Sequence, residues 1–456
     1  MAKRNSVLIL FILSCLTLMA GQQKRFTVMG FGDSITEGGK GFQTYLYPLW
    51  ERLFSAGYEF DFIGPNESEC RIGKLAHCGF KGRNAEFLEH ITESVYSKYP
   101  ADFVLIHAGH NYHADEKPVE RIIKSYRSII HKVLQSNPHA HILLATAVES
   151  GKLPKYSYIP QLNRAIFHFV EDLHSPHVTL VDMNAGFDWR TMTIADKVHP
   201  NKLGRDYMGE VWFKAMKPLL KKPVNSFDVK KIGYKRLLNG ELLEAHVFLP
   251  QTKPTHSAIG WFFAGGWKYG TPLQFYRECS HYARKGMVAV TFDYRIASKD
   301  SATVEDAIAD CKDAIRWLRT HSAYFDIDPA HIALAGASAG GSMAALLGCI
   351  DPDSPERLSR PNLLLLEYPT LQLSENALRS EMPPMTMIMG TKDEFTPIEH
   401  TERYIKKVKE LGNECKLYPF EGRHHPIFHY RKPLTADYAS MLKIMDSVLK
   451  KYHFTK

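Results

Sequence analysis

A short glycine-rich segment in the second half of the chain constrains the fold most strongly. Residues 331–335 form an apolar run typical of a buried strand, and residues 342–347 are typical of the start of a helix. Between them stands the pattern Gly-x-Ser-x-Gly, centred on Ser338. So sharp a strand-to-helix turn holds the serine hydroxyl clear of the backbone and directs the next N–H to the same side. The segment predicts a nucleophile at the edge of a sheet, or else a structural turn, because glycine and serine are common in turns.

The length and charge of the chain limit what it can be. A chain of 456 residues is too long for a single core and predicts two domains. Its hydrophobic content of 45% supplies enough apolar surface for full-sized cores. The net charge of +8 is modest, and the basic residues are scattered rather than gathered with aromatic residues. Nucleic-acid binding is therefore not expected.

The first 20 residues have the pattern of a secretory signal peptide. Lys3 and Arg4 precede an apolar run at residues 7–19, and small residues follow at 20–21. The run is too short, and its flanks are wrong, for a stable membrane span. No later stretch approaches 18 uninterrupted apolar residues. We therefore expect export to the periplasm or the extracellular space, and no membrane span in the mature chain.

The cysteines indicate neither a metal site nor a redox motif. Six of the seven remain after residue 20, and none forms a Cys-x-x-Cys pair. Cys70 and Cys78 lie close enough in sequence to close a small disulfide loop after export. Cys311 and Cys349 stand in apolar, helix-like surroundings and are expected to be buried thiols.

The first half alternates between strand and helix patterns. Apolar strand patterns occur at residues 25–31, 101–108, 141–148 and 178–183. Helical patterns occur at residues 43–56, 119–135 and 158–173. This alternation predicts a parallel sheet covered by helices on both faces.

Four motifs follow these elements in order, and together they resemble the SGNH (GDSL-type) hydrolase family. They are Gly32-Asp33-Ser34-Ile35, Gly79-Phe80-Lys81-Gly82, Gly109-His110-Asn111 and Asp196-x-x-His199. The resemblance covers residues 22–222 and implies an α/β fold, namely a flavodoxin-like three-layer domain. Most members of the family are esterases that act on acyl groups. The alternative for the first motif is that Ser34 or Asp33 only caps the following helix.

The same resemblance assigns roles to residues of the first half. Ser34 would be the nucleophile, His199 the general base and Asp196 the group that orients the histidine. The oxyanion would be bound by the N–H groups of Ser34 and Gly82 and by the side-chain amide of Asn111. Common members read Gly-Thr-Asn-Asp at the third motif, so this chain keeps the asparagine and lacks the aspartate. His110 is expected to be a pocket or structural residue rather than a second base.

A linker is expected near residues 217–228, which contain two prolines and three lysines. After it, two strand patterns at residues 229–238 and 241–249 flank Asn239-Gly240. Asn-Gly between two such runs is a strong hairpin signal. The second domain is expected to cover residues 227–456.

The second half resembles the α/β-hydrolase fold, in the esterase branch that carries Gly-x-Ser-Ala-Gly-Gly. Strand patterns occur at residues 257–263, 286–293, 331–335, 362–368, 385–390 and 415–420, with helical patterns at 274–284 and 304–322. The order Ser, Asp, His along the chain is that of the fold. The resemblance makes Ser338 the nucleophile and Asp393 the acid, with Glu394 as the alternative acid. It makes His425 the base, with the adjacent His424 as the alternative.

The oxyanion donors of the second half would be the N–H groups of Ala339, Gly265 and Gly266. Many relatives have His-Gly-Gly-Gly where residues 263–266 read Phe-Ala-Gly-Gly. The missing histidine removes a group that braces this loop but leaves the backbone donors in place. Residues 293–295, Asp-Tyr-Arg, resemble a segment that braces the loop in these esterases and are expected to be structural.

Two serine triads in one exported chain favour an esterase with two sites. The expected substrate is an acylated carbohydrate, from which acetyl or other acyl groups would be removed without a metal or organic cofactor. The first alternative is a lipase or general carboxylesterase. The second is a single active domain, with the other acting as a binding module. The sequence implies no particular oligomeric state.

Overall fold

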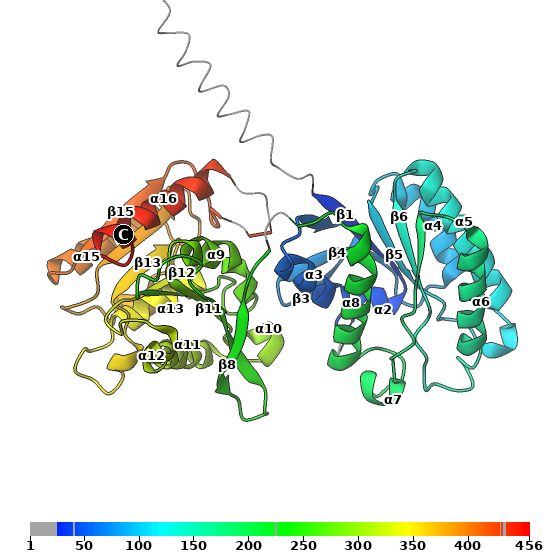
Figure 1. Ribbon diagram of the computed structural model, residues 1–456, viewed down its shortest axis with the longest axis horizontal. Helices are drawn as coiled ribbons and strands as arrows, with labels where there is room; N and C mark the ends of the chain where they lie inside the picture. The colour runs from blue at the N-terminus through cyan, green and yellow to red at the C-terminus, as the bar shows by residue number, and fades with distance from the viewer. Residues whose placement is uncertain (1–24, 40–41, 224–225, 429, 432–434) are drawn as a thin grey trace, which may run out of the picture. The chain divides into compact units, whose positions relative to one another are not determined.

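The computed structural model describes residues 25–39, 42–223, 226–428, 430–431 and 435–456. The predicted signal peptide, at residues 1–20, lies outside them, as do residues 224–225 of the predicted linker. The chain divides into two compact units. The second comprises Phe227–Lys456 together with Arg71–Gly73, and the first comprises the other described residues. Each unit has one sheet covered by helices (Figure 1).

The sheet of the first unit has the strand order β3-β4-β1-β5-β6-β7, and β2 pairs with β1. Its strands are β1 (Phe26–Gly32), β2 (Phe60–Phe62), β3 (Asn66–Cys70), β4 (Gly73–Gly79), β5 (Phe103–His107), β6 (His141–Ala145) and β7 (Val178–Val181). Its helices are α2 (Ser34–Glu37), α3 (Leu46–Ser55), α4 (Ala85–Tyr96), α5 (Val119–Ser136), α6 (Ile159–Leu173), α7 (Trp189–Met192) and α8 (Lys202–Met216). The strands from β4 through β1, β5 and β6 to β7 run parallel, so their carboxyl ends meet at one edge.

Helices cover both faces of this sheet. Figure 1 shows α3 and α8 on one side and α4, α5 and α6 on the other. Helix α5 illustrates the cause, because its buried apolar residues recur every three or four positions. They are Ile122, Tyr126, Ile129, Ile130 and Val133. These side chains join those of α4, α6 and the strands in one apolar core, which holds the carboxyl edge of the sheet in a fixed shape.

The expected disulfide between Cys70 and Cys78 is wrong, because the structure does not join these two residues. Strand β3 lies beside β4, with Asn66 Nδ2 donating to the Gly79 carbonyl and Ser68 Oγ bonded to His77 Nε2. This register places Cys78 opposite the first half of β3. Cys70 is then about three residues further along the strand, or about 10 Å away. A disulfide needs Cα atoms within about 7 Å.

The sheet of the second unit has the strand order β15-β14-β13-β12-β10-β11-β9-β8. Its strands are β8 (Lys230–Arg236), β9 (Leu242–Phe248), β10 (Ala258–Phe262), β11 (Val288–Phe292), β12 (Ile332–Ala337), β13 (Leu363–Glu367), β14 (Met385–Gly390) and β15 (Cys415–Phe420). The longer helices are α9 (Tyr276–Arg284), α11 (Val304–Thr320), α13 (Ala339–Gly348), α15 (Ile398–Glu410) and α16 (Ala436–Lys451). The predicted hairpin is confirmed, since β8 and β9 pair antiparallel around Asn239-Gly240. From β11 through β10 to β15 the strands are parallel.

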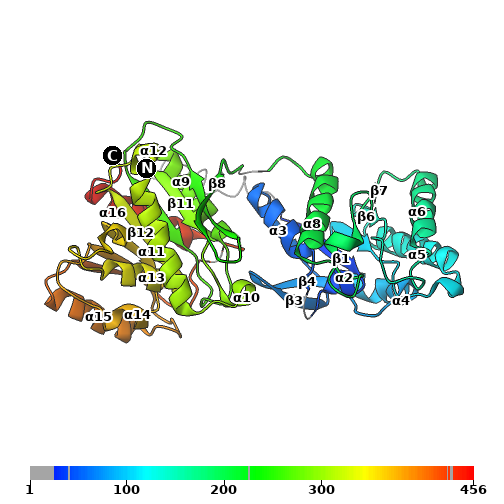
Figure 2. The same ribbon diagram turned by 90° about the horizontal axis from the view of Figure 1, so that it is seen from below.

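Helices α9 and α16 cover one face of this second sheet, and α11 and α13 cover the other (Figures 1 and 2). The predicted fold class, α/β in both halves, is confirmed. Among the residues that the structure describes, no helix is both long enough and apolar enough to cross a membrane.

Two candidate active sites

Ser34 stands at the carboxyl edge of the first sheet because β1 ends one residue before Asp33. Asp33 is the N-cap of α2, and its Oδ1 accepts the N–H of Ile35 at 3.0 Å. Asp33 therefore satisfies the start of the helix, and the Ser34 hydroxyl is left for another partner. Gly79, at the end of β4, allows α2 to lie close to this strand, because a Cβ at this position would lie 2.5 Å from the Glu37 backbone nitrogen.

The structure brings Ser34, His199 and Asp196 together in one chain of hydrogen bonds. Ser34 Oγ lies 2.8 Å from His199 Nε2, and His199 Nδ1 lies 2.5 Å from Asp196 Oδ2. Because a carboxylate can only accept, Nδ1 carries the proton and Nε2 is free to accept the serine proton. Burial acts to raise the pKa of Asp196, but hydrogen bonds from His199 and Val198 outweigh it, and the pKa is lowered. Asp196 therefore stays ionised at neutral pH and holds the ring in the basic tautomer.

An aromatic ring that sequence reasoning missed lies against this histidine. The Phe42 ring is stacked on the His199 ring, with centroids 4.2 Å apart and an angle of 26° between the planes. The stacking restricts rotation of the imidazole, and the ring face attracts the positive charge that the imidazole acquires on accepting a proton. Phe42 lies eight positions after Ser34 and outside the motif, so no local pattern marks it.

The predicted oxyanion donors of the first site lie in two loops that touch each other. Gly82 has φ +72°, a conformation that favours glycine. Asn111 has φ +69°, and its Nδ2 donates to the carbonyl of Arg83 at 2.9 Å. That bond uses one of the two amide hydrogens and ties the asparagine to the glycine loop, which leaves the second hydrogen for a ligand.

His110 is placed away from the proton-transfer chain, as expected of a structural residue. Its ring is 2% exposed, and Nε2 bonds to the Val148 carbonyl at 3.0 Å. Its Nδ1 faces Asp33 Oδ2 at 3.7 Å. His110 thus packs behind the helix cap that positions Ser34.

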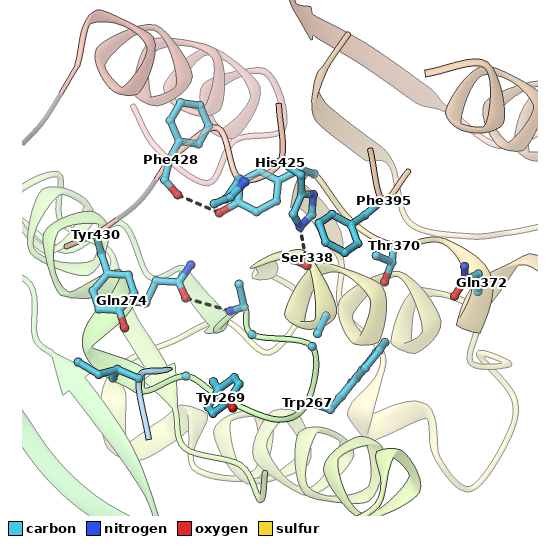
Figure 3. A pocket seen from close by; sticks show the side chains of 18 residues that line it. Trp267, Tyr269, Gln274, Ser338, Thr370, Gln372, Phe395, His425, Phe428 and Tyr430 are labelled. Carbon is cyan, nitrogen blue, oxygen red and sulfur yellow. Dashed lines mark hydrogen bonds between the residues drawn. The ribbon is translucent and has the colours of Figure 1, made fainter. Parts of the chain in front are cut away.

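Ser338 occupies the turn between β12 and α13, with φ +48° and ψ −118°. The turn is tight because α13 lies against the sheet, and a Cβ on Gly340 would lie 2.1 Å from the Phe262 carbonyl oxygen. The Ser338 N–H donates to the Glu367 carbonyl at 3.0 Å. The backbone of the serine is thereby fixed to β13, and its hydroxyl projects into a pocket (Figure 3).

The second chain of hydrogen bonds joins Ser338, His425 and Asp393. His425 Nε2 lies 2.9 Å from Ser338 Oγ, and His425 Nδ1 lies 2.8 Å from Asp393 Oδ2. The alternatives lie outside this chain, because His424 pairs with Glu394 at 3.4 Å and both side chains are more than half exposed. The geometry therefore favours His425 as base and Asp393 as acid. The Asp393 side chain is 0% exposed.

The loop that follows β10 carries the predicted donors Gly265 and Gly266, at φ +131° and +59°. It is held from two sides. The Tyr294 hydroxyl donates to the Phe263 carbonyl at 2.7 Å, which agrees with a structural role for residues 293–295. On the other side the Ala264 N–H donates to Gln274 Oε1 at 2.9 Å. Sequence reasoning missed Gln274, which follows the loop by eight residues or more.

These groups line a pocket of about 550 Å³ that holds Ser338, Ala339, His425 and both glycines. Six of the other residues that line it are aromatic (Figure 3). They are Trp267, Tyr269, Tyr368, Phe395, Phe428 and Tyr430. A mostly apolar wall with several aromatic rings suits an uncharged organic group bound beside the serine.

Comparisons with known proteins divide the chain in the same way. Residues 31–207 match the GDSL-like Lipase/Acylhydrolase family, and residues 246–361 match the BD-FAE family. The acetylxylan esterase of Xylanibacter ruminicola is 22% identical over 232 residues, covering 43% of this chain and 47% of that protein. Esterase LipC of Mycobacterium tuberculosis is 37% identical over 210 residues, covering 35% and 50%. The chain thus spans about half the length of these curated relatives.

Among solved structures, esterase 2 of Thermogutta terrifontis, phosphorylated by paraoxon, is 33% identical to this chain. The similarity covers 52% of this chain and 98% of that one, with a TM-score of 0.47.

Proposed function

We propose that this chain is an exported carboxylic ester hydrolase that removes O-acetyl or other acyl groups from polysaccharides or oligosaccharides. The match of residues 31–207 to the GDSL-like Lipase/Acylhydrolase family and of residues 246–361 to the BD-FAE family supports an esterase domain in each half. In this proposal each domain has its own active site.

One observation carries the proposal, namely the presence of two complete Ser–His–Asp chains on two different sheets. In both, a serine oxygen lies within 2.9 Å of Nε2, and a carboxylate oxygen lies within 2.8 Å of Nδ1. A hydroxyl becomes a useful nucleophile only when a base accepts its proton, and both serines meet this requirement.

Each site would act in two steps. The serine oxygen attacks the ester carbonyl while Nε2 of the histidine takes the serine proton. Backbone N–H groups bind the oxyanion, and the intermediate collapses as the imidazolium gives its proton to the leaving sugar oxygen. Water then attacks the acyl-serine through the same base. The acid is released and the serine is restored.

The two sites differ in exposure, which supports a division of labour between them. The Asp196 and His199 side chains are 38% and 19% exposed, against 0% for Asp393 and 9% for His425. An exposed site accepts an ester on a bulky chain, whereas a pocket around buried catalytic groups selects by the size of the group it holds. The relative described as an acetylxylan esterase supports a carbohydrate ester as substrate. The signal-peptide pattern at residues 1–20 supports export.

The test is acetate release from acetylated xylan, mannan, pectin and sialylated glycans. Wild type is compared with Ser34→Ala, Ser338→Ala and the double variant, with exposed Ser440→Ala as the matched control. We expect each single variant to lose part of the substrate range, the double variant to lose all release, and the control to match wild type. Release that persists in the double variant contradicts the proposal.

A general carboxylesterase is the second candidate, and the aromatic pocket at Ser338 favours it. The same variants assayed with p-nitrophenyl butyrate separate the two. Hydrolysis of this ester without acetate release from any glycan would favour a general carboxylesterase over a carbohydrate esterase. A single active serine would instead favour one catalytic domain beside a binding module.

A further inference from the structure

The loop that carries Gly265 and Gly266 lacks the histidine that braces it in many similar esterases, and Gln274 occupies a bracing position. Gln274 belongs to the short 3₁₀ helix Pro272–Phe275, which leads into α9. Its side chain is 7% exposed and lines the pocket. Its Oε1 accepts the Ala264 N–H at 2.9 Å, one residue before the first glycine (Figure 3).

This contact fixes the backbone of Ala264, directly before the two glycines whose N–H groups would bind the oxyanion. Tyr294 donates to the Phe263 carbonyl and Gln274 accepts the Ala264 N–H. Both polar groups of the peptide bond between residues 263 and 264 are therefore held. The helix that carries Gln274 is itself anchored, because Thr291 Oγ1 on β11 donates to the Pro272 carbonyl at 3.0 Å. Strand β11 thus positions the loop through Gln274.

The same contact fixes which end of the amide faces the pocket. A backbone N–H can only donate, so the amide oxygen must face Ala264, and the NH₂ group must point the other way. Figure 3 shows the Gln274 amide nitrogen directed away from the loop, toward the open part of the pocket. Among the described residues, none accepts a hydrogen bond from this nitrogen.

We propose that Gln274 is a positioning residue of the second site: it aligns the oxyanion loop through Ala264 and offers its NH₂ group to an oxygen of the bound ester. The proposal rests on the proposed ester hydrolysis at Ser338. In a pocket whose wall is mostly apolar, a directed polar donor contributes strongly to orientation of the substrate. A displacement of about 1 Å in a catalytic group can cost about 100-fold in rate.

The test uses the full chain with Ser34→Ala, so that only Ser338 contributes. Gln274→Ala removes both contacts, whereas Gln274→Glu keeps an acceptor for Ala264 and removes the donor. Ser257→Ala is the matched control, because it removes a buried hydrogen bond, to the Phe454 carbonyl, before the other end of β10 and away from the loop. The measurements are kcat and KM for p-nitrophenyl acetate and a peracetylated monosaccharide, melting temperature, and the rate at which a fluorophosphonate labels Ser338.

We expect Gln274→Ala to lower kcat and the labelling rate by about 10- to 100-fold. Gln274→Glu should recover most of kcat and of the labelling rate, while KM for the sugar ester stays raised in both variants. Ser257→Ala should lower the melting temperature and leave kcat within about twofold.

Two results overturn the proposal. One is a Gln274→Ala variant with kcat and labelling within about twofold of the parent. The other is a loss of activity that Gln274→Glu fails to recover and that Ser257→Ala reproduces. Failure of the proposed function looks different, because Ser338 would then react with the phosphonate at a rate that depends on Gln274 while no ester is hydrolysed.

Discussion

At the scale of single residues, both candidate acids are held by the backbone of their own loop. Asp196 Oδ1 accepts the N–H groups of Val198 and His199 at 2.9 and 3.0 Å. Asp393 Oδ1 accepts the N–H groups of Phe395 and Thr396, each at 2.9 Å. One oxygen of each carboxylate is thus fixed by the loop, and the other is aimed at a histidine Nδ1. The two domains thus hold the carboxylate in the same way, although their folds differ.

Replacement of Asn111 tests the predicted oxyanion site of the first domain. In a Ser338→Ala background, Asn111→Ala should lower kcat by about 100- to 1000-fold, because one donor to the developing oxyanion is lost. Steady-state kinetics with an acetyl ester measure the effect. Asn84→Ala is the control, since Asn84 caps α4 by accepting the Phe87 N–H and should affect stability by about 1 kcal/mol. Equal kcat values in the two variants would rule out Asn111 as a donor.

A buried acid in the second domain gives a prediction about pH. Burial raises the pKa of Glu278 to about 7, and burial and Glu278 together raise the pKa of Glu367 well above its usual range. Tyr438 on α16 bonds to Glu278, and Arg277 acts in the opposite sense to burial. Folded Glu278 keeps its proton where the unfolded chain, with a pKa of about 4.3, has lost it. Stability is therefore lost as the pH rises from about 4 to 7.

Glu278→Gln should remove this loss, because glutamine has a similar shape and does not ionise. The gain relative to wild type should grow with pH and reach about 3 kcal/mol near pH 8. Thermal unfolding at pH 5 and pH 8 measures it, with exposed Glu402→Gln as the control. A gain that is equal at both pH values would show that Glu278 is ionised in the folded chain.

At the scale of elements, the close approach of α13 to the sheet determines whether the Ser338 turn can form. Gly340→Ala places a Cβ 2.1 Å from the Phe262 carbonyl, a backbone atom that cannot move without the strand. We expect the substitution to lower stability by about 3 kcal/mol or more and to abolish hydrolysis at Ser338. Gly348→Ala, on the same helix, meets only the flexible end of Leu364 at 2.5 Å and should cost less. Similar melting temperatures for the two variants would contradict this account of the turn.

The strands beside the sites could be predicted because buried parallel strands are continuous apolar runs. Strand β13, for example, reads Leu-Leu-Leu-Leu-Glu and is fully buried. The edge strand β3 escaped prediction because it reads Asn-Glu-Ser-Glu-Cys, and only its last residue is buried. The predicted disulfide between Cys70 and Cys78 failed for a related reason. It depended on how β3 pairs with β4, and the sequence does not show this register.

The candidate site residues could be predicted where a short motif holds them, as around Ser34 and Ser338. Phe42 and Gln274 could not, because each meets its partner through tertiary packing. Phe42 contacts a histidine 157 positions later in the chain, at position 199. The choice of His425 over His424 also needed the structure, because adjacent residues point in different directions. That these groups are catalytic stays a prediction until the serines are tested.

At the scale of the whole molecule, each unit contains a complete chain of Ser, His and Asp within its own sheet. Neither site borrows one of these three groups from the other unit. Activities of the single variants Ser34→Ala and Ser338→Ala should therefore add up to the wild-type rate on any ester that both sites accept. A single substitution that abolishes both activities would contradict this independence.

If one chain carries two activated serines, covalent labelling should modify both. The full chain is treated with an excess of a fluorophosphonate, and the adducts are counted by intact-protein mass and located by peptide mapping. We expect two adducts, one on Ser34 and one on Ser338, with each Ser→Ala variant losing only its own. A single adduct, or labelling that persists in the double variant, would contradict it.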